Sequence, residues 1–325
     1  MMVRAWEPGM QDLGMAVVAI GVFDGMHLGH QALLADTVAL ARAEGVRAAV
    51  VTFEPDPHSL LEPEAAPPRL VARSDTFSMM EALGVELVLE VPFDEEMAAT
   101  EASDFIDGVL ASALTPVMVA VGEDFVFGRG GRGGLDLLRR EGARRGWRVV
   151  PHELVTADGT PITATRIRGL IGEGRVAEAA RLLGREHFVR GVVVRGRGLG
   201  ARIGVPTANV HPDGEVIVPP DAVYAVRASF GDGTSGHGVA SVGTPPSFPD
   251  AEYAVEVHLI DTDVDSALAG EPALVSFTER IRTQEAFDSV EALAARIQED
   301  IQVAKVILAA SSATSAGPTL ARRPE

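Results

Sequence analysis

Short apolar runs alternate with amphipathic segments through the first half of the chain. The apolar runs predict buried strands, and they lie at 17–22, 48–53, 87–91 and 117–121. The segments between and after them place apolar residues at helical spacing, and they predict helices at 30–43, 76–83, 103–114 and 135–145. Strands that alternate with helices predict a parallel sheet covered on both faces. In such a sheet, ligands bind at the carboxyl ends of the strands.

The pattern changes after about residue 183. From Phe188 onward, Val-rich runs separated by Gly and Pro predict strands at 189–194, 223–228, 238–242, 254–260 and 273–277. This spacing is typical of a small antiparallel barrel. A closing helix is predicted over 290–307, and residues 309–325, rich in Ser, Thr, Ala and Pro, are predicted to be disordered. We therefore expect an α/β domain over 1–184 and a β domain over 185–308.

Composition and charge narrow the function classes. The 325 residues are 46% hydrophobic, which is enough for two domain cores. The chain has no cysteine, which excludes disulfides, thiolate metal sites and thiol nucleophiles. The net charge is −18 and Lys305 is the only lysine, so a nucleic-acid partner is not expected and a P-loop or protein-kinase lysine is missing. Without a long apolar run or a start like a signal peptide, we expect a cytoplasmic protein with no membrane partner.

The most informative motif is Gly21-Val-Phe-Asp-Gly-Met-His-Leu-Gly-His30, which follows a predicted strand and opens a predicted helix. His27 and His30 are three residues apart, so they lie on one face of the helix start, and Gly29 leaves access to both. Two imidazoles beside a helix N-terminus can stabilise a triphosphate that is attacked at its α-phosphorus. A His-x-x-His metal site is the alternative, but this helix offers no further ligand at the usual spacing.

The motif resembles the signature of the cytidylyltransferase-like nucleotidyltransferases. Three further segments have counterparts in the bacterial bifunctional riboflavin kinases/FMN adenylyltransferases, the prokaryotic FAD synthetases: Val51-Thr-Phe-Glu-Pro55, Val121-Gly-Glu-Asp-Phe-Val-Phe-Gly128 and Thr165-Arg-Ile-Arg168. The resemblance extends from about residue 17 to residue 304. It implies a Rossmann-like nucleotidyltransferase domain followed by a six-stranded barrel like that of riboflavin kinases.

The resemblance also implies roles for residues of the first domain. His27 and His30 would be catalytic, holding the ATP phosphates and stabilising the transition state. The other residues implied for ATP binding are Gly21, Phe23, Asp24, Gly29, Thr165, Arg166 and Arg168. Those implied for the flavin side of the cleft are Asp56, Asp124, Phe125 and Phe127. Thr165 is further expected to cap a helix, whereas Asp24 could equally be a turn residue.

A second motif, Gly204-Val-Pro-Thr-Ala-Asn209, lies between predicted barrel strands. By composition alone it is an ordinary polar turn, although hydroxyl and amide oxygens suit magnesium. The family carries a Pro-Thr-Ala-Asn segment here, so the resemblance implies that Thr207 and Asn209 bind magnesium, and Gly204 and Pro206 belong to the same ATP site. Glu256 matches the carboxylate that takes a proton from the ribityl hydroxyl. Without the family, Glu256 is an outward-facing strand residue.

Several positions depart from the family pattern. Asp56 stands where the family has histidine, and Thr163-Ala-Thr165 replaces Ser-Ser-Thr. The kinase module departs around residues 201, 245 and 262–269, where an arginine, an aromatic residue and some glycines are replaced. The first two changes predict a weaker adenylyl step or a shifted substrate preference, and those in the kinase module predict a slower kinase or one that accepts an altered flavin.

The sequence therefore predicts an enzyme of FAD biosynthesis. The barrel would phosphorylate riboflavin to FMN, and the α/β domain would adenylylate FMN to FAD with release of pyrophosphate. ATP, riboflavin and FMN are the expected small-molecule substrates, with Mg²⁺ at both steps, in a monomer or transient oligomer. Two alternatives remain: a monofunctional FMN or flavin-analogue adenylyltransferase with an impaired kinase, and a non-catalytic flavin- or nucleotide-binding paralogue.

Overall fold

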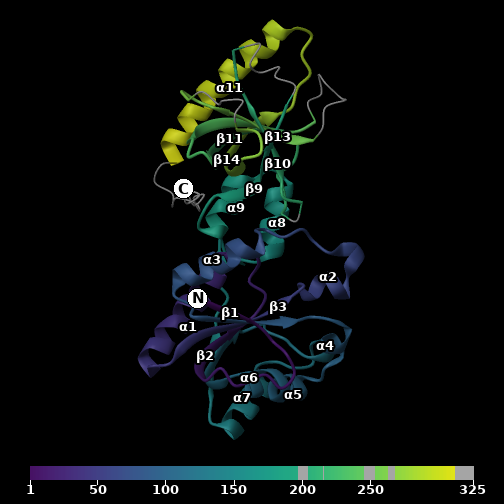
Figure 1. The fold of residues 1–325 in the computed structure, drawn as a ribbon, viewed down its shortest axis with the longest axis vertical. Coiled ribbons are helices and arrows are strands. Elements are labelled where there is room, and N and C mark those ends of the chain that lie inside the picture. Colours follow the sequence, from purple (N-terminus) through teal and green to yellow (C-terminus); the bar gives the residue numbers. More distant parts are fainter. Residues whose placement is uncertain (197–203, 215, 245–252, 263–267, 312–325) are drawn as a thin grey trace. The chain divides into compact units, whose positions relative to one another are not determined.

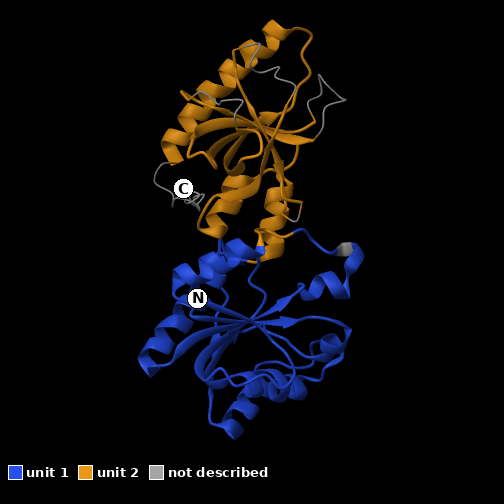
Figure 2. Cartoon of the chain, viewed as in Figure 1, with its two compact units in different colours: residues 1–68, 73–162 blue, residues 69–72, 163–325 orange. Residues whose placement is uncertain are grey.

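The chain divides into two compact units. The computed structural model describes residues 1–325 except 197–203, 215, 245–252, 263–267 and 312–325. Unit 1 comprises residues 1–68 and 73–162, and unit 2 comprises residues 69–72 and 163–325 (Figure 2). The division falls at 162/163 because, of the two helices between that point and the barrel, the second packs on barrel strands and the first packs on the second. A functional boundary at residue 184 stays a prediction.

Unit 1 is built on a six-stranded parallel sheet, which confirms the predicted α/β architecture. In spatial order the strands are β1 (Met2–Ala5), β4 (Leu87–Pro92), β3 (Arg47–Glu54), β2 (Met15–Ile20), β5 (Thr115–Gly122) and β6 (Arg148–His152). The four central strands match the predicted apolar runs. The two edge strands were not predicted, because β1 is exposed throughout and β6 is short and only partly buried.

Helices cover both faces of this sheet (Figure 1). The helices of unit 1 are α1 (Leu28–Glu44), α2 (Pro57–Leu61), α3 (Arg73–Leu83), α4 (Glu95–Ala99), α5 (Ala102–Phe105), α6 (Ala111–Ala113) and α7 (Leu135–Arg145). On β2, Val17 and Ala19 pack in a core with α1 and α3, whereas Val18 and Ile20 pack in a second core with α5 to α7. The helix predicted over 103–114 is interrupted by a π-helical turn at Ile106–Leu110, which contains the poor helix former Gly108.

Unit 2 contains a closed antiparallel barrel of six strands, as predicted. The strands are β9 (His187–Val194), β10 (Ala208–Pro212), β11 (Ala222–Phe230), β12 (Ser235–Gly243), β13 (Ala254–Leu259) and β14 (Pro272–Thr283). Five of them match the predicted runs. The sixth, β10, has no apolar run, because it alternates buried and outward-facing residues over only five positions. Val255, Val257 and Leu259 of β13 point into the core, so the residues between them face outward.

Within its described residues, unit 2 has the helices α8 (Ala164–Gly172), α9 (Val176–Leu183) and α11 (Val290–Ala310). α11 begins as predicted and packs its Ile301, Ala304 and Leu308 over β11 and β12. A partly buried ion pair joins α11 to the barrel, with the Arg282 Nη2 atom 2.8 Å from a carboxylate oxygen of the buried Asp300. Because α11 extends to Ala310, residues 309 and 310 of the predicted tail are helical, and residues 312–325 lie outside the described part of the chain.

Candidate active sites

The turn between β2 and α1 is shaped to present the first motif. Gly21 continues the sheet by donating its N–H to the Val51 carbonyl (3.1 Å). A 3-10 turn at Asp24–Met26 follows, in which Gly25 (φ 75°) and the fully buried Met26 (φ 42°) both adopt left-handed backbone conformations. The Gln31 Nε2 atom donates to the Met26 carbonyl oxygen (2.7 Å), so α1 holds the turn that precedes it. This turn fixes where the helix begins.

The two histidines of the motif lie against each other. His27 is the N-cap of α1, and its Nδ1 atom accepts a hydrogen bond from the His30 backbone N–H (3.3 Å). Their rings are stacked, with centroids 3.6 Å apart and planes inclined by 20°. Because His27 Nδ1 accepts, the proton of the neutral His27 ring is on Nε2. The pairing predicted from the spacing is thus present at the helix N-terminus.

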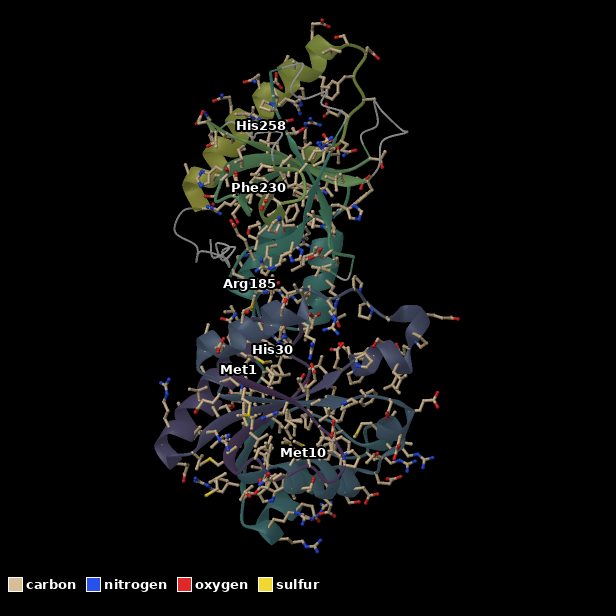
Figure 3. All side chains as sticks on the ribbon, in the orientation of Figure 1. Met1, Met10, His30, Arg185, Phe230 and His258 are labelled. Atoms are coloured by element: carbon tan, nitrogen blue, oxygen red, sulfur yellow. The ribbon has the colours of Figure 1, made fainter. Side chains whose placement is uncertain are left out.

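His30 is electrically neutral in this setting. Burial lowers its pKa well below the usual value, and the neighbouring His27 lowers it further. Its Nδ1 atom is buried without a hydrogen-bond partner among the described residues (Figure 3 labels His30). The ring of the buried Phe23 packs against His30 edge to face, with the two ring centroids 5.2 Å apart. A buried polar atom without a partner is costly, so a hydrogen-bonding ligand would be favoured here. An incoming anion would also raise the pKa of His30 again.

Gly29 gives the stacked rings their space. A Cβ atom at this position would lie 3.1 Å from His27 Cε1 and 3.2 Å from His27 Nδ1. These distances are shorter than ordinary van der Waals contacts, so a side chain here would displace the His27 ring. Glycine at residue 29 therefore has a steric reason in addition to the access that the sequence suggested.

The residues predicted for the flavin follow strands next to β2. Asp56 comes directly after β3 and caps α2, with its Oδ1 atom accepting from the His58 N–H (2.9 Å). Asp124 follows β5 and is exposed. Strands β3, β2 and β5 are adjacent and parallel, so their carboxyl ends lie on the same side of the sheet. Asp56, Asp124 and His27 all follow these carboxyl ends.

Two of the predicted flavin residues are aromatic, and they differ in burial. Phe127 is buried in the core, where its ring centroid lies 5.7 Å from that of Phe105. Phe125 is half-buried and stacks on Phe127 at 5.5 Å. Phe125 therefore has the more accessible surface of the two, and the buried Phe127 packs against one face of its ring.

The second phosphate motif lies on α8 in unit 2. The prediction that Thr165 caps this helix is wrong: the cap is Thr163, whose Oγ1 atom accepts from the Arg166 N–H (3.2 Å), and Thr165 lies inside the helix. Two threonines in one short segment made the error possible, because either could cap from composition alone. Arg166 and Arg168 are half-buried on the same helix. That these residues share one ATP site with the histidines stays a prediction.

In the barrel, strand pairing brings the kinase residues together. β10 and β13 are antiparallel neighbours, and Asn209 lies directly opposite Glu256. Both residues are half-buried on the outer face, because the residues on either side of them are buried in the barrel. Burial raises the pKa of Glu256 above its usual value. On the other neighbour, β12, Ser241 lies opposite Glu256.

The loop before β10 is fixed at three points. Gly204 has a left-handed backbone (φ 77°), and Val205 is buried with 2% of its surface exposed. The Pro206 carbonyl oxygen lies 2.9 Å from His258 Nδ1 (Figure 3 labels His258). The Thr207 side chain is half-buried one residue before the strand starts. The departures at residues 201 and 245 and at 263–267 lie outside the described residues.

Two residues of these sites were not predicted from the sequence. Gln31 follows His30 directly, and its only sequence signal is its place beside the motif. His258 follows Glu256 by two residues, which in a strand places both on one face. That spacing was the available signal for His258, but its partner in the loop depends on strand register.

Clusters of three or more His, Cys, Asp or Glu side chains that could hold a metal ion are absent from the described part of the chain. Among the described helices, none has the length and apolar character needed to cross a membrane.

Comparison with known proteins gives matches to both units. A family model described as FAD synthetase matches residues 10–166, and one described as riboflavin kinase matches residues 183–308. A bifunctional riboflavin kinase/FMN adenylyltransferase of Pseudomonas fluorescens is 36% identical over 91% of this chain and 94% of its own length. One of Bacillus subtilis is 33% identical over 89% of this chain and 91% of its own.

A solved structure extends the match to the fold. It is described as a macrolide-efflux protein from Streptococcus pneumoniae, and it shares 28% sequence identity with this chain at a TM-score of 0.84. The similarity covers 94% of this chain and 99% of that one. The α/β unit and the barrel therefore occur together in that structure as well.

Proposed function

The chain belongs to the family of bifunctional riboflavin kinases/FMN adenylyltransferases, and from this premise we propose that it makes FAD from riboflavin in two ATP-dependent steps. The barrel phosphorylates riboflavin to FMN, and the parallel-sheet domain joins FMN to the adenylyl group of ATP. The observation that carries this proposal is that each family match covers a unit in which the motif residues lie side by side: His27 with His30, and Asn209 with Glu256.

In the adenylyl step, a phosphate oxygen of FMN attacks the α-phosphorus of ATP and the bond to the β-phosphate breaks, releasing pyrophosphate. His27 and His30 supply the N–H groups that face the charge developing on the phosphates, together with the N-terminus of α1. Burial keeps the His30 ring neutral before ATP arrives, and His27 Nδ1 accepts a hydrogen bond, so the first contribution of both rings is hydrogen bonding rather than charge. When the triphosphate is bound, its charge favours the protonated imidazole, which strengthens these bonds.

The flavin of this step lies over the carboxyl edge of the sheet. Asp56 and Asp124 follow the two strands that flank β2, so they face the same edge as the histidines. Phe125 offers a half-exposed aromatic face on which the flavin ring stacks. Thr165, Arg166 and Arg168 contribute positive charge and a hydroxyl to the ATP phosphates.

In the kinase step, the ribityl hydroxyl attacks the γ-phosphorus of ATP, and ADP leaves. Glu256 accepts the proton of that hydroxyl, and its raised pKa brings it closer to the operating pH of a general base. Thr207 and Asn209 offer neutral oxygens, which fit Mg²⁺ because this ion keeps most of its ligands as water and phosphate oxygens. Bound there, Mg²⁺ would neutralise phosphate charge, while Thr207 and Asn209 fix where the ATP phosphates lie beside Glu256.

The functional domains are proposed to extend over residues 1–184 and 185–308. We place the protein in the cytoplasm, where the ATP used at both sites is available, and expect it to work as a monomer or transient oligomer.

Chromatography of reaction products tests the proposal directly. Purified protein with ATP and Mg²⁺ is given riboflavin in one reaction and FMN in another. Riboflavin should yield FMN and then FAD, and FMN should yield FAD and pyrophosphate. Unchanged riboflavin beside efficient FAD formation from FMN would leave a monofunctional adenylyltransferase, and unchanged FMN would refute the transferase.

A further inference from the structure

The barrel site contains a histidine to which neither motif gives a role. His258 shares the outer face of β13 with Glu256, two residues before it. Its Nδ1 atom lies 2.9 Å from the Pro206 carbonyl oxygen in the loop that leads into β10. A carbonyl oxygen can only accept, so Nδ1 carries the proton and donates. This hydrogen bond joins the strand of Glu256 to the loop of Thr207.

The bond lies where the pairing of the two strands ends. The register pairs Asn209 with Glu256 and Ala208 with Val257, so the next step in the same register places Thr207 opposite His258. Beyond that point Pro206 has no backbone N–H with which to continue the ladder. The imidazole of His258 supplies a side-chain donor to the Pro206 carbonyl instead. The loop is thereby tied to β13 just past the last backbone pair.

We propose that His258 is a positioning residue for phosphoryl transfer, which holds the Pro206 carbonyl and so fixes the oxygens of Thr207 and Asn209 beside Glu256. The inference rests on the proposed kinase function of the barrel. Two other contacts hold the same loop. Val205 is buried in the core at one end, and Ala208 pairs with Val257 of β13 at the other. His258 constrains the residues between these two contacts from the outer face.

Loss of this bond should act on the position of the ATP phosphates. Groups that orient metal or phosphate ligands without touching the reacting atoms typically contribute 10- to 100-fold to affinity or activity. Misplacement of ligands by a fraction of an ångström reduces the fraction of bound ATP in line for transfer. The effect should therefore appear in the dependence on Mg·ATP and leave the adenylyl step of unit 1 unchanged.

Two substitutions separate the hydrogen bond from the rest of the side chain. His258→Leu fills a similar space but cannot donate, whereas His258→Asn keeps an N–H donor near the place of Nδ1. We expect His258→Leu to lower kcat/KM for Mg·ATP in FMN formation by about 10- to 100-fold, and His258→Asn to recover most of the loss. His211→Leu is the matched control, because His211 is an exposed histidine on the outer face of β10. FAD formation from FMN should be equal in all variants.

Hydrogen exchange of residues 204–209 gives a readout independent of activity. The amides of this segment should exchange faster in His258→Leu than in the parent, and near the parent rate in His258→Asn. Parent-like kinetics and exchange in His258→Leu would overturn the inference, as would an Asn variant as impaired as the Leu variant. If the parent itself forms no FMN, the kinase proposal fails, and the exchange rates alone then decide whether His258 holds the loop.

Discussion

The two units assemble their reactive groups in different ways. In unit 1, the stacked imidazoles come from one short motif, and a single turn and helix start bring them together. In unit 2, Asn209 and Glu256 are distant in sequence and meet only because β10 and β13 pair in one register. A local motif specifies the first site, whereas the second depends on the whole barrel. Changes that disturb barrel pairing should therefore affect kinase activity before adenylyl transfer.

Burial nevertheless favours the uncharged form of the acid–base group in each site. It lowers the pKa of His30 and raises the pKa of Glu256, so in each case the neutral form is favoured. The consequences differ, because neutral His30 awaits an anion whereas Glu256 must ionise to act as a base. Substitution of the histidines of unit 1, and then of Glu256 in unit 2, tests this comparison of the two sites most strongly.

Replacement of both imidazoles should have the largest effect. In His27→Ala/His30→Ala, FAD formation from FMN should fall by about 10³-fold or more, because one preorganised donor to developing charge typically contributes 10²- to 10³-fold. FMN formation from riboflavin in the same preparation should be unchanged and serves as the internal control for folding. Undiminished FAD synthesis would mean that the adenylyl site lies elsewhere.

Removal of the barrel carboxylate should give the reverse result. Glu256→Gln should lower FMN formation by about 10²- to 10⁴-fold, the usual contribution of a general base, with FAD formation from FMN unaffected. Because the folded state raises the pKa of Glu256, ionisation of this residue opposes folding as the pH rises above its unfolded-state pKa. The Gln variant should therefore unfold at the same or a higher temperature at pH 7. A lower unfolding temperature together with lost activity would indicate a structural role for Glu256.

The same contrast explains what could be predicted from sequence. The central strands and α7 follow from local periodicity, and the stacking of His27 and His30 follows from a three-residue spacing at a helix start. Strand β10 could not be found in this way, because its pattern is too short to separate from a turn. The bond from His258 to Pro206 depends on register, which no local pattern contains.

Two details could not be settled from the sequence, for local reasons. Composition did not distinguish Thr163 from Thr165 as the helix cap, because both have the required hydroxyl. Phe127 and Phe125 look alike in sequence, and only the fold reveals that Phe127 is buried in the core while Phe125 keeps an accessible face. Which of the two phenylalanine rings is buried thus had to come from the structure.

A second buried histidine sharpens the comparison of the two units. His187 in the barrel is 1% exposed, its Nε2 atom donates to the Ile217 carbonyl oxygen (2.9 Å), and burial lowers its pKa to about 4. Its pKa in the unfolded chain is 6.5, so the unfolded state binds more protons as the pH falls below that value. Stability is therefore fully present above pH 6.5 and is lost as the pH falls toward 4.

This linkage predicts the pH dependence of unfolding. Between pH 7 and pH 5, His187 should lower the free energy of unfolding by about 2 kcal/mol. Denaturant titrations of the parent and of His187→Gln, which keeps a donor for Ile217, measure this contribution as the difference between their pH slopes. His211→Gln, at an exposed histidine, should keep the parent slope. Equal slopes for the parent and His187→Gln would show that His187 is not held neutral.

The smallest expected effect isolates ring position in unit 1 from ring chemistry. Gly29→Ala keeps both histidines but places a Cβ atom 3.1 Å from the His27 ring, so that ring must shift by a few tenths of an ångström from its stacked position. We expect about a tenfold loss of FAD formation, whereas the helix itself gains up to about 1 kcal/mol from alanine propensity. Gly108→Ala, where a Cβ meets no atom within 4 Å, is the matched control and should keep parent activity. Reduced FAD formation in a protein no less stable than the parent would tie the activity to the stacked geometry, whereas parent activity in Gly29→Ala would show that the site tolerates a displaced His27.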